Sequence, residues 1–368
     1  MSNYKYIGNK IAVHPGHCIE EYIDYIGMTQ EELAYRIGTT PKNISILIRG
    51  EQSMTVDMAN KLYRFTGVSV QSWLNMQASY DEMIEEAKND KELVFEKDVY
   101  KELKYKYFRD NYELIDIPNK TYEQIVEVRG FLKISSLSLL KGKNKLVKFR
   151  SAKRELTESN IIKANTMVLI ATNKSYELRN IPKFDKKKFL RTINYILTLT
   201  KDCDDFYKQI KKEFYFCGVD LQVIPNITGS KLNGATRIVG KHILLMLSDR
   251  YSNSDTFWFT LFHEIGHIIN GDFGASFEMD EGEIEEKANQ YAENMLIDPN
   301  IYKDFVDKKV FTVESIKEFA EKTNRNEGII LGRLQKDGLV KYNDVRFKDL
   351  KKKYTLTYEQ EEFLLEKS

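Results

Sequence analysis

The sequence is poor in cysteine, proline and long apolar runs. Its 368 residues include only three cysteines, Cys18, Cys203 and Cys217, whose spacing suits neither a metal cluster nor a redox pair. A sparse, odd count predicts reduced thiols and therefore a cytoplasmic protein. No apolar run is long enough to span a bilayer, and the N-terminus lacks the pattern of a signal peptide. With six prolines and nineteen glycines, long disordered linkers are not expected.

The sequence also lacks an excess of charge of either sign. It has 56 lysines and arginines against 55 aspartates and glutamates, a net charge of +1. This balance produces no overall attraction to nucleic acid or to an anionic membrane. The length predicts two or three domains. Histidine is scarce as well, with five in the whole chain, so the position of each one is informative.

Two of the five histidines belong to an HExxH motif, the HEIGH pentapeptide at 263–267. On a helix, His263 and His267 lie one turn apart on the same face, where two imidazoles can hold one Zn²⁺. Glu264 lies beside them, placed to take a proton from the attacking water. The flanking residues are mostly apolar, and two histidines and a glutamate buried in such a helix need a partner. The motif therefore predicts a zinc site.

A second helix, within residues 280–299, is predicted to provide the third ligand, because its apolar residues recur at helical spacing. Glu285 would complete a site of two histidines and one glutamate, and Glu286 is the competing ligand. Asn289, one turn after Glu285, could accept the far N–H of a ligand histidine and fix its orientation. The other acids of this run are expected to form a solvated first turn.

The HEIGH motif, followed by E-x-x-A-N-x-Y-A-x-x-M-L-I-x-P at 285–299, resembles the ImmA/IrrE family of zinc metallopeptidases. This resemblance implies a reduced thermolysin-like fold and endopeptidase activity. It implies that His263, His267 and Glu285 bind zinc, with Glu264 as the general base. Residues 232–248 resemble the strands that precede the active-site helix in the family, and residues 329–335 resemble a segment of members fused to a DNA-binding domain. Asp298 departs from the family, which often has proline directly after the aliphatic run.

The family also suggests how a substrate binds. In a thermolysin-like peptidase an edge strand beside the active-site helix holds the substrate backbone in extended form. The predicted edge consists of Asn233, Gly234, Ala235 and Thr236. Three residues are left open as donors to the oxyanion: Tyr291, Arg237 and His242. The resemblance implies a protein substrate, either a repressor or an antitoxin, whose cleavage would relieve repression.

Residues 14 to 80 form a separate pattern, with helices predicted at 14–26, 30–37, 41–50, 55–63 and 69–80. The second and third are short and joined by a tight turn after Gly38, which is the helix-turn-helix pattern. The HPG start at 14–16, M-T-Q-E-E-L-A at 28–34, N-I-S-x-L-I-R-G at 43–50 and S-W-L-N-M-Q-x-x-Y-D at 72–81 resemble the XRE class and its HigA-type antitoxin domains. His14 and His17 are expected to serve in capping and packing.

Five residues are predicted to contact double-stranded DNA. In the helix-turn-helix arrangement the residues that face base edges are Thr40, Lys42, Asn43 and Ser45, and Arg49 lies nearer the backbone. The segment has no basic excess, although phosphate neutralisation normally supplies most of the affinity. A module for dimerisation or protein contact is therefore the alternative, and a homodimer is left open in either case.

The sequence as a whole predicts an α+β protein that is mostly helical. An all-α helix-turn-helix domain at 1–84 precedes a helical connector and intermediate segment at 85–181, a zinc peptidase domain at 182–345 and a charged tail at 346–368. The connector helix is expected from Glu85 to Arg109. The basic run from Lys141 to Arg154 is expected to be a solvated loop, with contact to nucleic acid or an acidic partner as the alternative.

Two functions are consistent with these patterns. The first is a zinc-dependent endopeptidase and transcriptional regulator that binds DNA and cleaves a partner repressor or antitoxin. The second is a HigA-type antitoxin or transcriptional repressor whose peptidase-like domain only senses or binds another protein.

Overall fold

A computed structural model of the protein describes residues 4–7, 10–142, 156–201, 205–250, 253–277 and 282–354. The chain divides into two compact units, residues 1–95 and 96–368. Most of the described residues are helical and the rest of the regular structure is two small sheets, which confirms the predicted α+β class. Cys203, most of the basic run that begins at Lys141, and the end of the charged tail lie outside the described residues. The finer division of the chain into connector, peptidase and tail stays a prediction.

The first unit begins with an antiparallel hairpin, β1 (Tyr4–Ile7) and β2 (Lys10–Val13). The expectation of an all-α domain is therefore wrong, because this short hairpin precedes the helical pattern that the sequence reveals. The helices that follow are α1 (Pro15–Ile26), α2 (Gln30–Ile37), α3 (Pro41–Ile48), α4 (Val56–Thr66) and α5 (Val70–Leu103).

Side chains cap the starts of these helices. The hydroxyls of Thr29, Thr40 and Thr55 accept hydrogen bonds from the third backbone N–H of α2, α3 and α4. His14 Nδ1 accepts from the backbone N–H of Gly16 at 3.0 Å, which confirms the predicted capping role of His14. The starts of α1, α2, α3 and α4 thus follow from local sequence.

The α2–α3 pair is held by one small apolar core. Leu33, Ala34, Ile37, Ile44 and Ile48, the residues expected to pack together, are all buried. Between the two helices Gly38 adopts φ 67° and ψ 51°, a left-handed conformation that a residue without Cβ adopts at little cost. Its N–H bonds to a carbonyl of the last turn of α2.

Helix α5 differs from the prediction. The helix expected at 69–80 and the connector expected from Glu85 form one helix of 34 residues, because residues 81–84 contain neither glycine nor proline and nothing interrupts the turns. The helix ends at Leu103, where Lys104 takes φ 56°. The chain is divided into its two units between residues 95 and 96, within this helix.

The second unit contains the larger sheet and the remaining helices. Its helices are α6 (Tyr105–Tyr112), α7 (Thr121–Leu132), α8 (Glu158–Glu177), α9 (Lys186–Thr198), α10 (Phe206–Phe216), α11 (Ser254–Asn270), α12 (Glu283–Leu296), α13 (Pro299–Val306), α14 (Val313–Thr323) and α15 (Glu327–Lys336). Its strands are β3 (Val219–Ile224), β4 (Leu232–Val239), β5 (His242–Ser248) and β6 (Gly274–Phe277). Short 3-10 turns, η1 and η2, occupy Leu137–Leu140 and Val345–Leu350.

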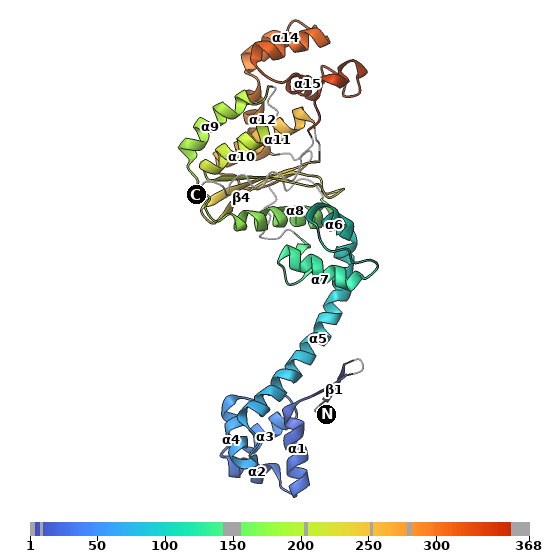
Figure 1. The fold of residues 1–368 in the computed structure, drawn as a ribbon, viewed down its shortest axis with the longest axis vertical. Helices are drawn as coiled ribbons and strands as arrows, with labels where there is room; N and C mark the ends of the chain where they lie inside the picture. The colour runs from blue at the N-terminus through green and yellow to red at the C-terminus, as the bar shows by residue number, and fades with distance from the viewer. Residues whose placement is uncertain are drawn as a thin grey trace. The chain divides into compact units, whose positions relative to one another are not determined.

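The four strands form one mixed sheet in the order β3-β5-β4-β6. Strand β3 runs parallel to β5, whereas β4 is antiparallel to both β5 and β6. Helix α8 covers one face of the sheet, and α9, α10, α11 and α12 lie on the other (Figure 1). The sequence did not reveal α8, because it is buried around most of its circumference and lacks a polar face.

The core of the second unit lies between the sheet and the helices on the α11 side. Helix α11 contributes Trp258, Leu261, Phe262, Ile265 and Ile268 to it. This apolar surface anchors α11 on the sheet and leaves its remaining residues available for a site. Among the described residues, no helix is both long and apolar enough to cross a membrane.

Candidate metal centre and nucleic-acid interface

Helix α11 places the two histidines of the HExxH motif together in the interior. The rings of His263 and His267 are 4.6 Å apart between centroids, and their Nε2 atoms are 3.0 Å apart. His267 is fully buried and His263 is nearly so. Two nitrogen atoms that face each other at this distance must share a proton or a cation, because two lone pairs repel.

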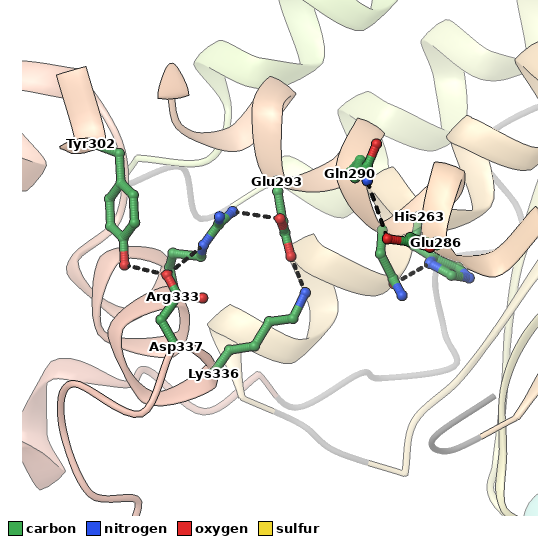
Figure 2. Close-up of polar contacts among 9 residues, drawn as sticks. His263, Glu286, Gln290, Glu293, Tyr302, Arg333, Lys336 and Asp337 are labelled. Atoms are coloured by element: carbon green, nitrogen blue, oxygen red, sulfur yellow. Dashed lines mark hydrogen bonds and ion pairs between the residues drawn. The ribbon is translucent and has the colours of Figure 1, made fainter. Parts of the chain in front are cut away.

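Helix α12 brings a carboxylate to the same point. Glu285 Oε2 lies 3.1 Å from His263 Nε2, and Glu285 Oε1 lies 3.5 Å from His267 Nε2. Burial alone raises the pKa of the Glu285 carboxyl, but the hydrogen bonds and charges of the two histidines outweigh burial and lower it to about 2. Glu286, the competing candidate, is exposed and accepts a hydrogen bond from Gln290 (Figure 2).

The three side chains form a donor set that could hold a metal ion, with ligand atoms within 4.8 Å of one another. Zinc bonds to nitrogen and oxygen of about 2.0–2.1 Å in a tetrahedral site place ligand atoms about 3.3 Å apart. The separations of 3.0, 3.1 and 3.5 Å lie around that value. In type and spacing these residues fit a zinc ion, and a buried carboxylate beside two imidazoles provides the negative charge that a dication needs.

Asn289 orients one of these three side chains. Its Oδ1 atom lies 2.9 Å from His263 Nδ1, so Nδ1–H donates to the amide oxygen. That bond leaves the lone pair on Nε2, the nitrogen that faces Glu285. Asn289 is one turn after Glu285 on α12, so a single helix face supplies a candidate ligand and the group that orients another.

Glu264 lies beside the donor set but is not part of it. It is fully buried and lies against β4. A Cβ atom built on Gly234 would be 2.6 Å from Glu264 Oε1, a distance that real side chains do not adopt. Only glycine at 234 therefore leaves room for the Glu264 carboxyl, which is next to His263 in the chain.

The predicted edge strand is not at an edge. We expected Asn233, Gly234, Ala235 and Thr236 to present a free backbone, but β4 pairs with β5 on one side and with β6 on the other. The sheet ends at β6, whose Ser276 Oγ lies 3.3 Å from His263 Nε2. The sequence missed β6 because four residues, all buried, carry no alternating pattern.

The three residues left open as oxyanion donors occupy different places. His242 Nε2 is 2.8 Å from Ser175 Oγ in a buried contact with α8. Tyr291 packs against Gly266 next to His267, and burial raises the pKa of its hydroxyl to about 12, so it keeps its proton at neutral pH. Arg237 pairs with Leu244 in the β4–β5 ladder. Of these three, only Tyr291 packs directly against α11, at Gly266.

A polar network anchors the far end of α12 to α15 (Figure 2). Glu293, two turns after Glu285, accepts from Arg333 at 3.0 Å and also from Lys336. Arg333 also contacts Asp337 at 3.0 Å, and Asp337 accepts from the Tyr302 hydroxyl at 2.7 Å. These contacts restrain α12 along its axis and so restrain the position of Glu285.

A cavity of about 260 Å³ lies between α11, α12 and α15. Phe259, Glu293, Arg333 and Lys336 are in its wall, and the four residues at 263, 264, 267 and 285 are not. Phe259 contacts both the cavity and the donor set, because its ring also lies 6.2 Å from the His263 ring between centroids. The cavity is thus a neighbour of the donor set and not part of it.

In the first unit, α3 presents most of the predicted DNA contacts to solvent. Thr40, Lys42 and Asn43 are exposed, and Ser45 is half-buried. Asn43 Nδ2 donates to Thr39 Oγ1 at 3.2 Å, which orients the amide. Arg49 is exposed but engaged by Glu51, with two contacts of 2.8 and 3.0 Å. Its charge is therefore partly neutralised within the unit.

The comparisons with known proteins concern the N-terminal part of the chain. It is 37% identical over 84 residues to virulence-associated protein I of Dichelobacter nodosus, a match that covers 23% of this chain and 76% of that protein. It is 36% identical over 73 residues to the HTH-type transcriptional regulator YddM of Escherichia coli, a match that covers 19% of this chain and 78% of that protein. No protein-family model matches the chain.

Among solved structures, an antidote protein of the HigA family from Coxiella burnetii is 28% identical, with a TM-score of 0.21, and the match covers 22% of this chain and 88% of that chain. The antitoxin HigA of Pseudomonas aeruginosa, solved with the higBA promoter, is 26% identical, with a TM-score of 0.21, and the match covers 22% of this chain and 88% of that chain.

The contact between Gly234 and Glu264 leads to a stability prediction. Gly234→Ala should destabilise the protein by about 1–3 kcal/mol, because the new methyl group overlaps a carboxyl that is buried and cannot move into solvent. Gly130→Ala is the matched control: Gly130 lies in α7 with nothing near its Cβ position, so this change should stabilise by up to about 1 kcal/mol. Urea unfolding followed by circular dichroism compares the two. An unchanged midpoint for Gly234→Ala would contradict the contact.

Proposed function

Since the chain belongs, through its N-terminal helical unit, to the family of HTH-type transcriptional regulators, we propose that it is a DNA-binding transcriptional regulator. The observation that carries this proposal is the exposed N-terminal turn of α3, with Thr40, Lys42 and Asn43 facing solvent. The first turn of the second helix is the part of a helix-turn-helix that meets base edges in the major groove.

The individual side chains on α3 suit different tasks. An asparagine amide can bond to two positions of an adenine, so Asn43 is the candidate for direct base reading. Lys42 is exposed and can contact phosphate, which contributes affinity without sequence preference. Arg49 must leave Glu51 before it can reach phosphate, so its contribution to binding is reduced by the ion pair.

Replacing Asn43 tests the base-reading role. On a duplex selected by the wild-type protein from a random pool, Asn43→Ala should weaken binding about 5- to 150-fold, the equivalent of losing about 1–3 kcal/mol of base discrimination. On an unrelated duplex its affinity should match wild type. Fluorescence anisotropy at a fixed salt concentration measures both.

The control for this experiment is Asn75→Ala, which removes an exposed asparagine from α5 of the same unit and should change neither affinity. Equal losses on both duplexes for Asn43→Ala would mean that Asn43 does not read bases. If wild type binds no duplex even at low salt, the unit is a protein-contact module, and the DNA-binding proposal is wrong.

For the second unit we propose zinc-dependent endopeptidase activity on a protein substrate. The proposal is supported by the convergence of His263, His267 and Glu285, with the buried Glu264 beside them. It also rests on the resemblance of the HEIGH and E-x-x-A-N segments to the ImmA/IrrE family. As that resemblance implies, the substrate would be a repressor or an antitoxin. The cleavage would then connect to the transcriptional role of the first unit.

In the proposed reaction each side chain has a separate task. A bound zinc ion would polarise the scissile carbonyl and make water more acidic. His263, His267 and Glu285 would hold the ion, and Asn289 keeps the His263 ring in position. Glu264 would take the proton from the attacking water and pass it to the leaving amine.

An extended substrate could pair with β6, because among the described strands β6 has a partner on one side only. This strand replaces residues 233–236 as the candidate for the backbone contact. Ser276 of β6 is next to His263, so a peptide bound along β6 would pass close to the donor set.

Zinc content tests the ligand set. The purified protein should carry about one zinc ion per chain. Glu285→Ala should lower this content strongly, because two histidines alone hold zinc poorly. Glu286→Ala, the same change at the next residue, should leave it near wild type since Glu286 is exposed and outside the donor set. Metal analysis by mass spectrometry measures the zinc content of both variants. A wild-type protein without zinc after supplementation contradicts the proposal.

Glu264→Gln separates catalysis from metal binding. It should keep the zinc and the fold but lower cleavage about a hundred- to ten-thousand-fold, because the proton acceptor is gone. His263→Ala should lose both the zinc ion and the cleavage activity. Each variant is co-expressed with the repressor or antitoxin encoded beside it, and that partner is followed by immunoblot. If Glu264→Gln shortens the partner as well as wild type does, the unit acts as a sensing or binding module and not as a peptidase.

A further inference from the structure

A strongly basic face occurs in the second unit, on helices that contribute no residue to the donor set. Helices α9 and α10 pack against each other on one side of the sheet (Figure 1). Helix α9 carries four cations and no acid, and α10 carries three cations and one acid, a net of six positive charges. The remainder of this almost neutral chain therefore carries a compensating negative excess.

The two helices present these charges together. The Tyr195 hydroxyl donates to Gln209 Oε1 at 2.6 Å at one end, and Lys188 Nζ donates to the Phe216 carbonyl at 2.9 Å at the other. These contacts join the outward sides of two antiparallel helices. We define the basic face by the side chains that lie on these sides: Lys187, Leu190, Arg191, Tyr195, Lys208, Lys211, Lys212 and Phe216.

The charges of the basic face are arranged in a way that costs stability. Lysines fill the first three positions of α9, where the helix dipole favours acids, and the Asp185 carboxylate that caps the helix offsets only part of their charge. Lys187 and Arg191 are one turn apart, and so are Lys208 and Lys212, and like charges at this spacing repel. A face selected only for solubility would alternate charges, as α2 does with Arg36 and Glu32.

Several cations of the basic face are available to a partner. Among the described residues no ion pair involves Lys187, Arg191 or Lys212, and all three are exposed. Leu190, Tyr195 and Phe216 lie between them with 43%, 44% and 47% of their surface exposed. A partner that brings negative charge would remove the repulsion and cover the apolar surface at the same time.

We propose that the basic face is a second, sequence-independent DNA contact, which binds the phosphates of duplex DNA. Cations one turn apart are separated by about 6 Å along a helix, so each can meet a different phosphate of a strand whose phosphates recur about every 3.4 Å of the axis. The inference rests on the DNA-binding proposal for the first unit and adds a second contact to it. The alternative partner, an acidic protein, is an outcome of the test.

The test is the salt dependence of DNA binding by the full chain. The triple variant Lys187→Gln, Arg191→Gln, Lys212→Gln removes three exposed charges. Each lost phosphate contact should reduce the slope of log affinity against log salt by about 0.9, a total of about 2–3. Affinity for selected and unrelated duplexes should fall by the same factor, because phosphate contacts carry no sequence information.

The matched control is Lys303→Gln, Lys317→Gln, Lys322→Gln, which removes three exposed lysines from α13 and α14, where acids lie among them. It should leave the slope unchanged. Circular dichroism establishes that both variants are folded. A second readout is acetylation of the wild-type protein: the duplex should protect Lys187 and Lys212 and leave Lys303 and Lys322 reactive.

The possible failures can be told apart. If wild type binds DNA and the basic-face variant keeps its slope, or if both triple variants lose slope equally, the basic face does not bind phosphate, while the helix-turn-helix proposal stands. Retained DNA binding without protection of Lys187 and Lys212 leads to the same conclusion, and an acidic protein then becomes the candidate partner. If wild type binds no duplex, both proposals are wrong.

Discussion

The close packing of α11 against α12 is the contact on which the candidate metal centre depends. A Cβ on Gly266 would lie 3.1 Å from the Tyr291 ring and 3.3 Å from Ala288. The two helices can therefore come this close only because residue 266 has no side chain. This approach brings Glu285 to His263 and His267 in the interior. A buried carboxylate without those partners would cost several kcal/mol, and removing one member of a buried pair typically costs about 3–5 kcal/mol. The helices and the cluster therefore depend on each other.

Helix α12 combines three tasks along one face. Glu285, Asn289 and Glu293 follow one another at four-residue spacing, and they contact the histidine pair, the His263 ring and the α15 cations. Helix geometry places residues at this spacing in a row. A shift of α12 along its axis would disturb all three contacts at once, so the α15 network some distance from the donor set contributes to its geometry.

The two units differ in local surface charge, although the net charge of the whole chain is close to zero. In the first unit the α3 surface has few free cations, because Glu51 engages Arg49. In the second unit the basic face concentrates positive charge, and no ion pair among the described residues involves its Lys187, Arg191 or Lys212. A chain of net charge +1 can thus carry a local polyanion-binding surface, since charge acts over about a Debye length of roughly 8–10 Å and not over the whole protein. Composition alone conceals such a surface.

The sequence by itself determined the features set by local interactions: the capped helices of the first unit and the HExxH helix. Periodicity and capping residues act within a few positions, so they can be read from the chain. Tertiary structure decided what depends on contacts between distant segments. It selected Glu285 over Glu286 for the donor set, because the rotation of α12 against α11 buries one and exposes the other. It placed β6 outside β4, since strand pairing is not encoded in four buried residues. It covered α8 on nearly all sides, and a helix whose environment is set by its neighbours loses the amphipathic pattern on which sequence reasoning relies.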